Sequence, residues 1–346
     1  MESKVPRKSE TIVLAGQSIA RGERRKLQLH VGKLYDNTDI KIPLEVVRGS
    51  LDGPTLFVSA AVHGDELNGV EVCKRLLDVR FLRDLRGCLI VIPIVNVFGF
   101  NNLSRYLPDR RDLNRSFPGS PNGSLASRLA HTFMQEVVAK ADYGIDLHTG
   151  AVHRKNLPQI RAAIDDPKTL SLAEAFGIPV IVHSEVRDGS LRQAVHEMQI
   201  PILLYEGGEA LRYDEHAIRV ALHGILSVMH AIGMLDPQKR LGKFQQKHAS
   251  PFIAKSSHWI RANRSGILKT LTKIGAMVHK DEVVALISDP YGDDVDIVKA
   301  RLDGVVIGSN QLPVVYEGDA LFHVASFHDP ERVEEYLADL EDYQPI

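Results

Sequence analysis

One stretch, residues 55–77, most constrains how this chain can fold. An apolar run ends in His63-Gly64-Asp65-Glu66, and apolar residues then recur at three- and four-residue steps, the pattern of an amphipathic helix. We therefore predict a buried strand, a tight turn and a helix. Residues three apart on such a turn point the same way, so His63 and Glu66 can bind one metal ion together. A His-x-x-Glu pair also occurs by chance in a chain with 15 histidines, so its place beyond a strand end carries the argument.

Composition limits the class of protein. The chain has 346 residues, 25% charged and 44% hydrophobic, which is typical of a soluble protein with room for two domains. Its 42 Lys and Arg against 44 Asp and Glu give no basic excess, so no nucleic-acid partner is expected. Cys73 and Cys88 form no Cys-x-x-Cys, which argues against a disulfide framework or a thiolate zinc site. Without an 18-residue apolar run or a secretory signal, we expect no membrane span and a cytoplasmic location.

Strand and helix patterns alternate along the first 235 residues. After a charged leader (1–10), short strands with an edge hairpin are expected in residues 11–47. Further strands are expected at 88–100, 143–150, 179–183 and 200–210, and helices at 124–141, 168–176, 188–198 and 214–235. Several of these strands are nearly continuous apolar runs, as in parallel sheets buried on both faces. The alternation predicts an α/β fold, with a mixed, mostly parallel sheet flanked by helices.

Two other strand ends carry residues suited to chemistry. The strand at 143–150 ends in a segment with Asp146 and His148, and the strand at 200–210 ends in one with Glu206 and Glu209. Because ligands bind beyond the carboxyl ends of such strands, His148 is a candidate ligand and Asp146 a candidate for orienting it. Glu206, beside two glycines that allow a close approach, is a candidate general base. Glu209 fits a solvated or helix-capping residue better.

Other histidines receive weaker readings. His183 also falls near a strand end and competes for a role, but nothing around it matches a ligand context. His131 on the helix at 124–141 fits a packed or solvated residue, and His30 lies on the polar side of its strand.

A long polar loop, residues 101–123, holds four arginines, which are Arg105, Arg110, Arg111 and Arg115. Loops of this length inside a compact domain are usually functional or disordered. Its segment 112–118 mixes apolar and polar residues, so we expect it to pack. Arginine suits the recognition of carboxylates, and we interpret the loop as a substrate-carboxylate clamp.

Together the strand ends supply a metal site. His63, Glu66 and His148 form a His₂Glu set with one open position, the ligand count of catalytic zinc hydrolases. One Zn²⁺ per chain is expected, although such a set discriminates poorly among divalent ions. Zinc would lower the pKa of a water to about 7 and polarise a carbonyl.

The remaining candidates then take roles around that metal. Glu206 would take a proton from the water and pass it to the leaving amine. Arg105 would stabilise the oxyanion of a tetrahedral intermediate. Asn114 and Arg115 would hold a carboxylate of the substrate.

Four motifs, HGDE, DLNRSFPG, DLHTG and YEGGE, occur in this order within residues 55–210. In the identity and order of these motifs, the chain resembles the succinylglutamate desuccinylase/aspartoacylase family, whose members are relatives of the zinc carboxypeptidases. The resemblance implies a zinc-carboxypeptidase-like sheet with a small C-terminal β domain. It also implies the same zinc ligands and general base as above, with the Asn-Arg pair on the substrate carboxylate. The arginine that polarises the carbonyl is matched to Arg105, with Arg110 or Arg111 as alternatives because the loop length differs between members.

The last third of the chain has a different character. Residues 236–256 are expected to be a linker, and residues 257–346 a small all-β domain with a terminal helix. About residues 257–326 resemble a lipoyl- or biotinyl-like sandwich, but the hairpin at 288–294 has no lysine at its tip. Covalent lipoate or biotin is therefore not expected, and the domain would shape the active-site entrance or an oligomer interface.

The function predicted from these features is a zinc-dependent deacylase. It would cleave the amide bond of an N-acyl amino acid or a similar small carboxylate, and a homo-oligomer is an open possibility. The alternatives are a metallocarboxypeptidase acting on peptide ends, an esterase, and a non-catalytic binding protein of the same fold. The sequence identifies neither the acyl group nor the amino acid.

Overall fold

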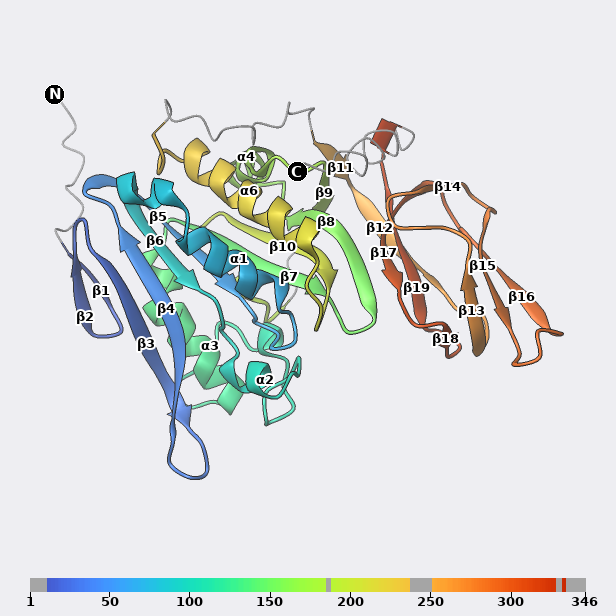
Figure 1. Cartoon of the computed structure of the whole chain (residues 1–346), viewed down its shortest axis with the longest axis horizontal. Coiled ribbons are helices and arrows are strands. Elements are labelled where there is room, and N and C mark those ends of the chain that lie inside the picture. The colour runs from blue at the N-terminus through green and yellow to red at the C-terminus, as the bar shows by residue number, and fades with distance from the viewer. Residues whose placement is uncertain (1–10, 185–187, 237–250, 328–331, 334–346) are drawn as a thin grey trace.

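The computed structural model describes residues 11–184, 188–236, 251–327 and 332–333, and the predicted leader at 1–10 lies outside them. A 13-stranded mixed sheet runs through the molecule, and a 4-stranded sheet lies at its C-terminal end (Figure 1). Helices cover both faces of the first part of the large sheet. The predicted α/β fold with a mixed sheet is therefore confirmed.

The elements follow the chain in this order. The strands of the first part are β1 (Thr11–Leu14), β2 (Gln17–Ala20), β3 (Arg24–Lys33), β4 (Asp39–Arg48), β5 (Leu51–Ala60), β6 (Arg86–Ile92), β7 (Tyr143–Gly150), β8 (Arg154–Ala162), β9 (Val180–His183) and β10 (Ile202–Glu209). The helices are α1 (Asn68–Leu77), α2 (Val97–Asn101), α3 (Leu125–Glu136), α4 (Pro167–Phe176), α5 (Leu191–Glu197) and α6 (Glu215–Ala231), with 3₁₀ turns η1 (Arg80–Asp84), η2 (Leu113–Arg115) and η3 (Val138–Lys140). The C-terminal strands are β11 (Phe252–Ala254), β12 (Ser256–Arg261), β13 (Gly266–Thr270), β14 (Met277–Val278), β15 (Val283–Ser288), β16 (Val295–Lys299), β17 (Gly304–Asn310), β18 (Val314–Val315) and β19 (Ala320–Ser326).

Parallel strands form the centre of the large sheet. Its order is β12-β19-β17-β8-β10-β7-β5-β6-β4-β3, and β6, β5, β7 and β10 pair parallel. Antiparallel pairs, β4 with β6 and β8 with β10, flank this centre. The predicted parallel character thus holds for the centre, whereas β17, β19 and β12 extend the sheet with antiparallel pairs.

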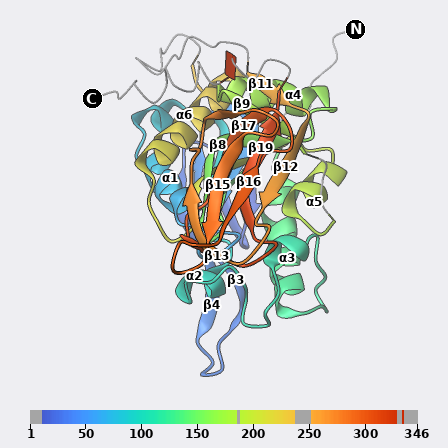
Figure 2. The same cartoon turned by 90° about the vertical axis from the view of Figure 1, so that its right-hand side faces the viewer.

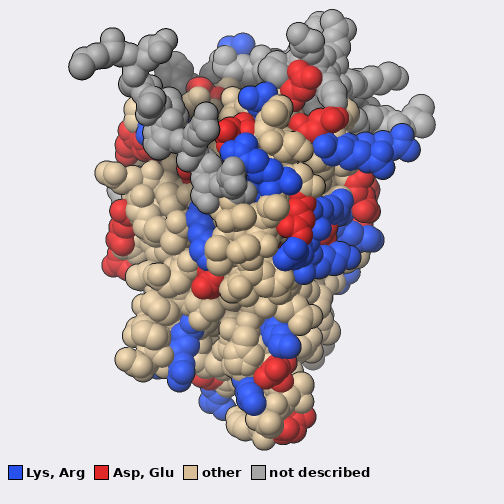
Figure 3. Space-filling view, turned by 90° about the vertical axis from the view of Figure 1, so that its left-hand side faces the viewer, with Lys and Arg blue, Asp and Glu red and all other residues tan. Residues whose placement is uncertain are grey.

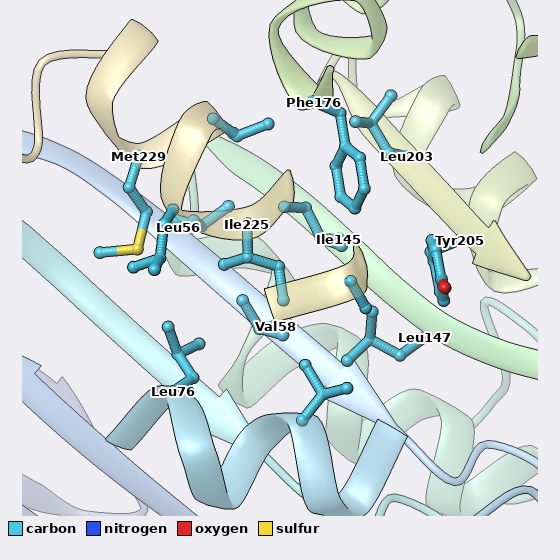
Figure 4. Packing of buried hydrophobic residues seen from close by; sticks show 14 of the residues in the cluster. Leu56, Val58, Leu76, Ile145, Leu147, Phe176, Leu203, Tyr205, Ile225 and Met229 are labelled. Carbon is cyan, nitrogen blue, oxygen red and sulfur yellow. The ribbon is translucent and has the colours of Figure 1, made fainter. Parts of the chain in front are cut away.

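Both faces of each central strand are buried, because successive side chains point to opposite faces of the sheet and pack into a hydrophobic core on each face. Leu56 and Val58 of β5 pack under α1, α4 and α6, as Figure 4 shows for this core. Phe57 packs on the opposite face with residues of α3 and α5. Figure 2 shows α1 and α6 on one side of the sheet and α3 and α5 on the other. The parallel strands therefore end between two helical layers, which is where a site can be enclosed.

Two segments differ from the sequence prediction. The run predicted as one strand at 88–100 is β6 followed by α2, because Pro93 lies just past the end of β6 and Asn96 caps the helix. The Asn96 side chain accepts a hydrogen bond from the Gly99 amide at 2.8 Å. Strand β8 was not predicted, because its sequence, RKNLPQIRA, has charges and a proline in place of an alternating pattern.

The C-terminal strands join the large sheet. β17 pairs with β8, with Gly308 opposite Asn156. The predicted linker at 236–256 is described only in part, because residues 237–250 lie outside the described ranges. Of the residues that are described, β11 pairs with β9. The predicted terminal helix also lies outside them except for residues 332 and 333, which are helical. The domain boundaries themselves stay a prediction.

Candidate metal centre

The HGDE segment forms the predicted turn between β5 and α1. The Glu66 amide donates to the His63 carbonyl at 3.2 Å, and both side chains are buried. Gly64 is required here, because a Cβ atom at this position would lie 2.0 Å from the backbone carbon of Gly99 in α2. The turn is therefore fixed by close packing against α2 as well as by its own hydrogen bond.

The carboxylate of Glu66 lies between two imidazoles. Its Oε1 atom is 2.7 Å from Nδ1 of His63, and its Oε2 atom is 2.8 Å from Nδ1 of His148 on β7. The three ligand atoms lie within 4.8 Å of one another, and all three residues are buried. Within the described residues this is the group of three His, Cys, Asp or Glu side chains placed to share an ion. The structure thus brings together the three residues predicted as ligands.

A carboxylate also faces the outer nitrogen of each histidine. Asp146 Oδ2 lies 2.7 Å from Nε2 of His148, and Asp112 Oδ1 lies 3.2 Å from Nε2 of His63. Such contacts hold the proton on Nε2, so that Nδ1 can present a lone pair to a metal. Asp146 takes the orienting position predicted for it, whereas no role was predicted for Asp112.

The charges of this cluster are strongly coupled. Burial lowers the pKa of His148, but Asp146 and Glu66 outweigh burial and raise that pKa well above its usual value. Burial alone would lower the pKa of His63, but Glu66 and Asp112 outweigh burial, and the net effect is a raised pKa. Burial favours the neutral form of Glu66, but the two imidazoles hold its pKa well below the usual range. The surrounding carboxylates therefore favour positive charge at both imidazoles, and a bound cation would supply positive charge at the same place.

The donor set fits a divalent transition-metal ion. Two imidazole nitrogens and a carboxylate oxygen are zinc ligands, and they are gathered here in a buried position. Three protein ligands leave a coordination position for substrate or water. The chemistry of the residues is thus consistent with the one Zn²⁺ predicted per chain.

Of the arginines considered for the oxyanion role, Arg105 is the one that reaches the cluster. Its Nη1 atom lies 3.4 Å from Glu66 Oε1, and its Nε and Nη2 atoms lie 3.2 and 3.0 Å from Asp112 Oδ2. Arg110 and Arg111 are exposed. Arg105 therefore adds positive charge directly beside the predicted metal position.

Asn114 and Arg115 follow Asp112 in the 3₁₀ turn η2. Asn114 is buried, and its Oδ1 atom accepts a hydrogen bond from the Leu191 amide of α5 at 2.9 Å. Arg115 is exposed, and its Nη1 atom donates to the Asn114 carbonyl at 2.5 Å. The loop packs, as predicted, and it carries Arg115 on the surface close to Asp112.

Glu206 lies in the same row of the sheet as His148. The two residues are partners in the parallel pair of β10 and β7, so their side chains share a face. Glu206 makes an ion pair with Arg161 at 3.2 Å and a hydrogen bond from Asn156, both on β8. Glu209 instead accepts from the His153 amide at 3.1 Å. Of the two glutamates, Glu206 is thus the one in register with a predicted ligand.

The two glycines after Glu206 serve packing. A Cβ atom at Gly208 would lie 2.4 Å from Nδ2 of Asn68, and one at Gly207 would lie 2.4 Å from the Tyr205 hydroxyl. Asn68 also donates to the Gly207 carbonyl at 3.1 Å. The predicted close approach at these glycines is therefore made here by protein side chains, Asn68 and Tyr205.

The other histidines lie apart from the cluster. His183, at the end of β9, faces Asp165 at 3.7 Å, and His30 is mostly exposed beside Asp39 at 3.3 Å. His131 is half-buried on α3. The preference for His148 over His183 agrees with this arrangement.

Sequence reasoning missed three residues that touch the site: Asp112, Asn156 and Arg161. Asp112 precedes Asn114 in a motif that was recognised, and its N-cap position was a usable signal. Asn156 and Arg161 lie on the unpredicted strand β8, so nothing placed them beside Glu206.

Two general properties of the molecule bear on its partners. None of the described helices combines the length and the apolar character needed to cross a bilayer. On the face in Figure 3, where β1 to β4 lie, acidic and basic side chains are scattered among uncharged ones.

Comparison with known proteins gives consistent matches. Residues 52–232, more than half of the chain, match the family model described as the succinylglutamate desuccinylase/aspartoacylase catalytic domain. A curated relative, N-alpha-acetyl-L-2,4-diaminobutyric acid deacetylase of Halomonas elongata, is 27% identical over 83% of this chain and 86% of its own length.

Solved structures agree with the sequence matches. A succinylglutamate desuccinylase/aspartoacylase from Rhodobacter sphaeroides superposes with a TM-score of 0.79 at 25% identity, covering 88% of this chain and 96% of that one. The product-bound ectoine utilization protein EutE (DoeB) from Ruegeria pomeroyi gives 0.78 at 26% identity, covering 87% and 95%.

Proposed function

Because this chain belongs to the succinylglutamate desuccinylase/aspartoacylase family, we propose that it is a zinc-dependent deacylase of a small N-acyl amino acid. The observation that carries the proposal is the buried cluster of His63, Glu66 and His148, with Glu206 in the same row of the sheet. A relative named as a deacetylase of an N-acetylated amino acid supports cleavage of an amide bond.

The metal site has two parts, the side chains that bind the ion and those that orient the binding side chains. When bound, zinc supplies a Lewis acid that activates water and polarises the amide carbonyl. His63, Glu66 and His148 hold the ion. Asp112 and Asp146 keep the two imidazoles oriented with Nδ1 toward it.

Two side chains move or stabilise charge during hydrolysis. Glu206 accepts a proton from the attacking water and gives it to the leaving amine nitrogen, which leaves as a neutral amine. Arg105, fixed by Asp112, donates hydrogen bonds to the oxygen that gains negative charge when the carbonyl is attacked. The released products are an amino acid and a free carboxylic acid.

The substrate would be recognised through its carboxylate. Arg115 offers an exposed guanidinium three residues after Asp112, and Asn114 fixes the turn that presents it through its bond to α5. The relative from Halomonas elongata is named as a deacetylase of an N-acetylated amino acid, and we extend that class of substrate to this chain.

A hydrolysis screen tests the proposal. Zinc-loaded protein is offered N-acetyl and N-succinyl amino acids, short peptides and simple esters, each with and without a chelator. Chelator-sensitive release of amine from one acyl-amino-acid series would support the deacylase and name its substrate. Preference for peptides would indicate a carboxypeptidase and preference for esters an esterase. Silence across the panel with zinc bound would contradict the proposal and leave a binding protein of this fold.

Two finer expectations belong to the proposal. They are the kinship of the fold with zinc carboxypeptidases and a cytoplasmic location.

A further inference from the structure

Strand β8 holds both oxygens of Glu206. Nε of Arg161 lies 3.2 Å from Oε1, and Nδ2 of Asn156 donates to Oε2. The Nε–H of Arg161 makes no hydrogen bond among the described residues, so its contact with Glu206 is an ion pair. The direction of this carboxylate therefore depends on where Arg161 and Asn156 are placed.

The Arg161 guanidinium also contacts His323, a buried residue of β19 in the C-terminal strands. Nη2 of Arg161 lies 3.4 Å from Nδ1 of His323. Because a guanidinium can only donate, Nδ1 is the acceptor and the ring proton sits on Nε2. Nε2 then donates to the Ser257 hydroxyl at 2.9 Å. These two contacts thus assign Nδ1 of His323 as the acceptor that faces Arg161.

Stacking fixes the plane of that imidazole. Trp259 on β12 is the cross-strand partner of His323, and their ring centroids lie 4.4 Å apart with an interplanar angle of 7°. The guanidinium of Arg154 from β8 lies 5.4 Å from the centroid of the Trp259 ring. The imidazole is therefore held on one face by an indole and at both nitrogens by polar partners.

Asn156 meets the C-terminal strands as well. It pairs with Gly308 of β17, and a Cβ atom at that position would lie 2.8 Å from Oδ1 of Asn156. Both groups that hold Glu206 thus pack against residues after position 250.

We propose that His323 is a positioning residue of the reaction, through which the C-terminal strands hold Arg161 and thereby the carboxylate of Glu206. This inference rests on the proposed role of Glu206 as the general base. It gives the C-terminal strands a part in catalysis that does not require them to touch the substrate.

The test compares three variants in the full-length, zinc-loaded protein. His323→Phe keeps a ring against Trp259 but removes the acceptor that faces Arg161. We expect kcat to fall about tenfold to a hundredfold, since small misplacements of a catalytic group have such effects, with KM within about twofold. His323→Asn puts an amide oxygen near the position of Nδ1 and should recover most of the loss. Val324→Ala, a buried change on the same strand away from Arg161, serves as the matched control and should keep kcat.

Crystal structures of the wild type and of His323→Phe supply a readout apart from activity. We expect the Glu206 carboxylate to turn away from its wild-type direction in the variant. An unchanged Glu206–Arg161 contact would overturn the inference, as would a wild-type kcat in His323→Phe or an equal loss in Val324→Ala. A wild type that hydrolyses nothing in the panel would instead refute the proposed function, and the two crystal structures would then decide the positioning role alone.

Discussion

Nε2 of His148 lies 2.7 Å from Oδ2 of Asp146, and both side chains are buried on the same strand. The other oxygen of Asp146 accepts from the Ser59 hydroxyl at 2.7 Å on the neighbouring strand β5. The imidazole is therefore oriented by a carboxylate that is itself held from a second strand. This chain of contacts prepares Nδ1 for a metal before any metal is bound.

We expect Asp146→Asn to lower zinc affinity by about tenfold to a hundredfold, because the orienting charge behind His148 is lost. Competition with a chromogenic chelator measures the change. Ser59→Ala, which removes only the support of Asp146, should have a smaller effect in the same direction. Equal affinity of Asp146→Asn and wild type would show that the contact does not tune the site.

Zinc should stabilise the folded protein through the same cluster. A ligand that binds only the folded state adds about 2.7 kcal/mol at a hundred times its Kd. Thermal unfolding with graded free zinc should therefore show a rising Tm, reversed by chelator. In His148→Ala the zinc-dependent rise should disappear, whereas His183→Ala, altering a histidine outside the cluster, should retain it. A rise that survives in His148→Ala would place the metal elsewhere.

Glu206→Gln should retain zinc and lose turnover by about a hundredfold to ten-thousandfold, because the amide cannot accept the proton of the attacking water. Zinc content is measured on the same preparation as kcat. Glu209→Gln is the paired control, since Glu209 bonds to the His153 amide and is predicted to be dispensable. A full loss in Glu209→Gln with activity kept in Glu206→Gln would reverse the assignment of the base.

Site residues could be predicted from the sequence where a local secondary-structure pattern ends in a residue suited to metal binding. The apolar run before His63 and the periodic residues after Glu66 predict strand, turn and helix, and the structure has these elements at nearly the predicted bounds. His148 follows from the same logic on β7. Such residues are predictable because secondary structure alone brings the carboxyl ends of parallel strands together.

Other parts of the site depend on tertiary contacts that have no local pattern. Arg105 could not be separated from Arg110 and Arg111 by sequence, because the choice depends on how the loop packs over Glu66. Arg161 was missed because β8 has a polar sequence whose strand form is imposed by pairing with β10 and β17. The failures thus fall on residues whose neighbours are distant in the chain.

Helix α4 offers a test of pH dependence away from the metal. The Asp166 side chain accepts from the Thr169 hydroxyl at 2.6 Å and the Thr169 amide at 3.0 Å, and these bonds lower the pKa of Asp166. The ionised cap therefore stabilises the fold above the unfolded pKa of about 3.9 and is lost as pH falls through the lower folded value.

Asp166→Ala should accordingly cost about 1 kcal/mol in the free energy of unfolding at pH 7. The difference from wild type should shrink as pH falls from about 5 toward 3, as measured by urea unfolding at each pH. A difference that grows with acidity would mean that the carboxyl acts as a protonated donor.

The core behind the site gives a case in which packing should override helix propensity. Gly224 lies inside α6, where alanine is normally favoured by about 1 kcal/mol. A Cβ atom there would lie 1.9 Å from Cε1 of Phe176. The Phe176 ring stacks on the ring of Tyr205, with their centroids 5.8 Å apart, and Tyr205 is the residue before Glu206. We therefore expect Gly224→Ala to destabilise the protein by about 1–3 kcal/mol, measured by urea unfolding. In a Phe176→Leu background, which frees space for the methyl group, the same substitution should cost at least about 1 kcal/mol less. Strictly additive losses would show that the ring of Phe176 does not determine the cost.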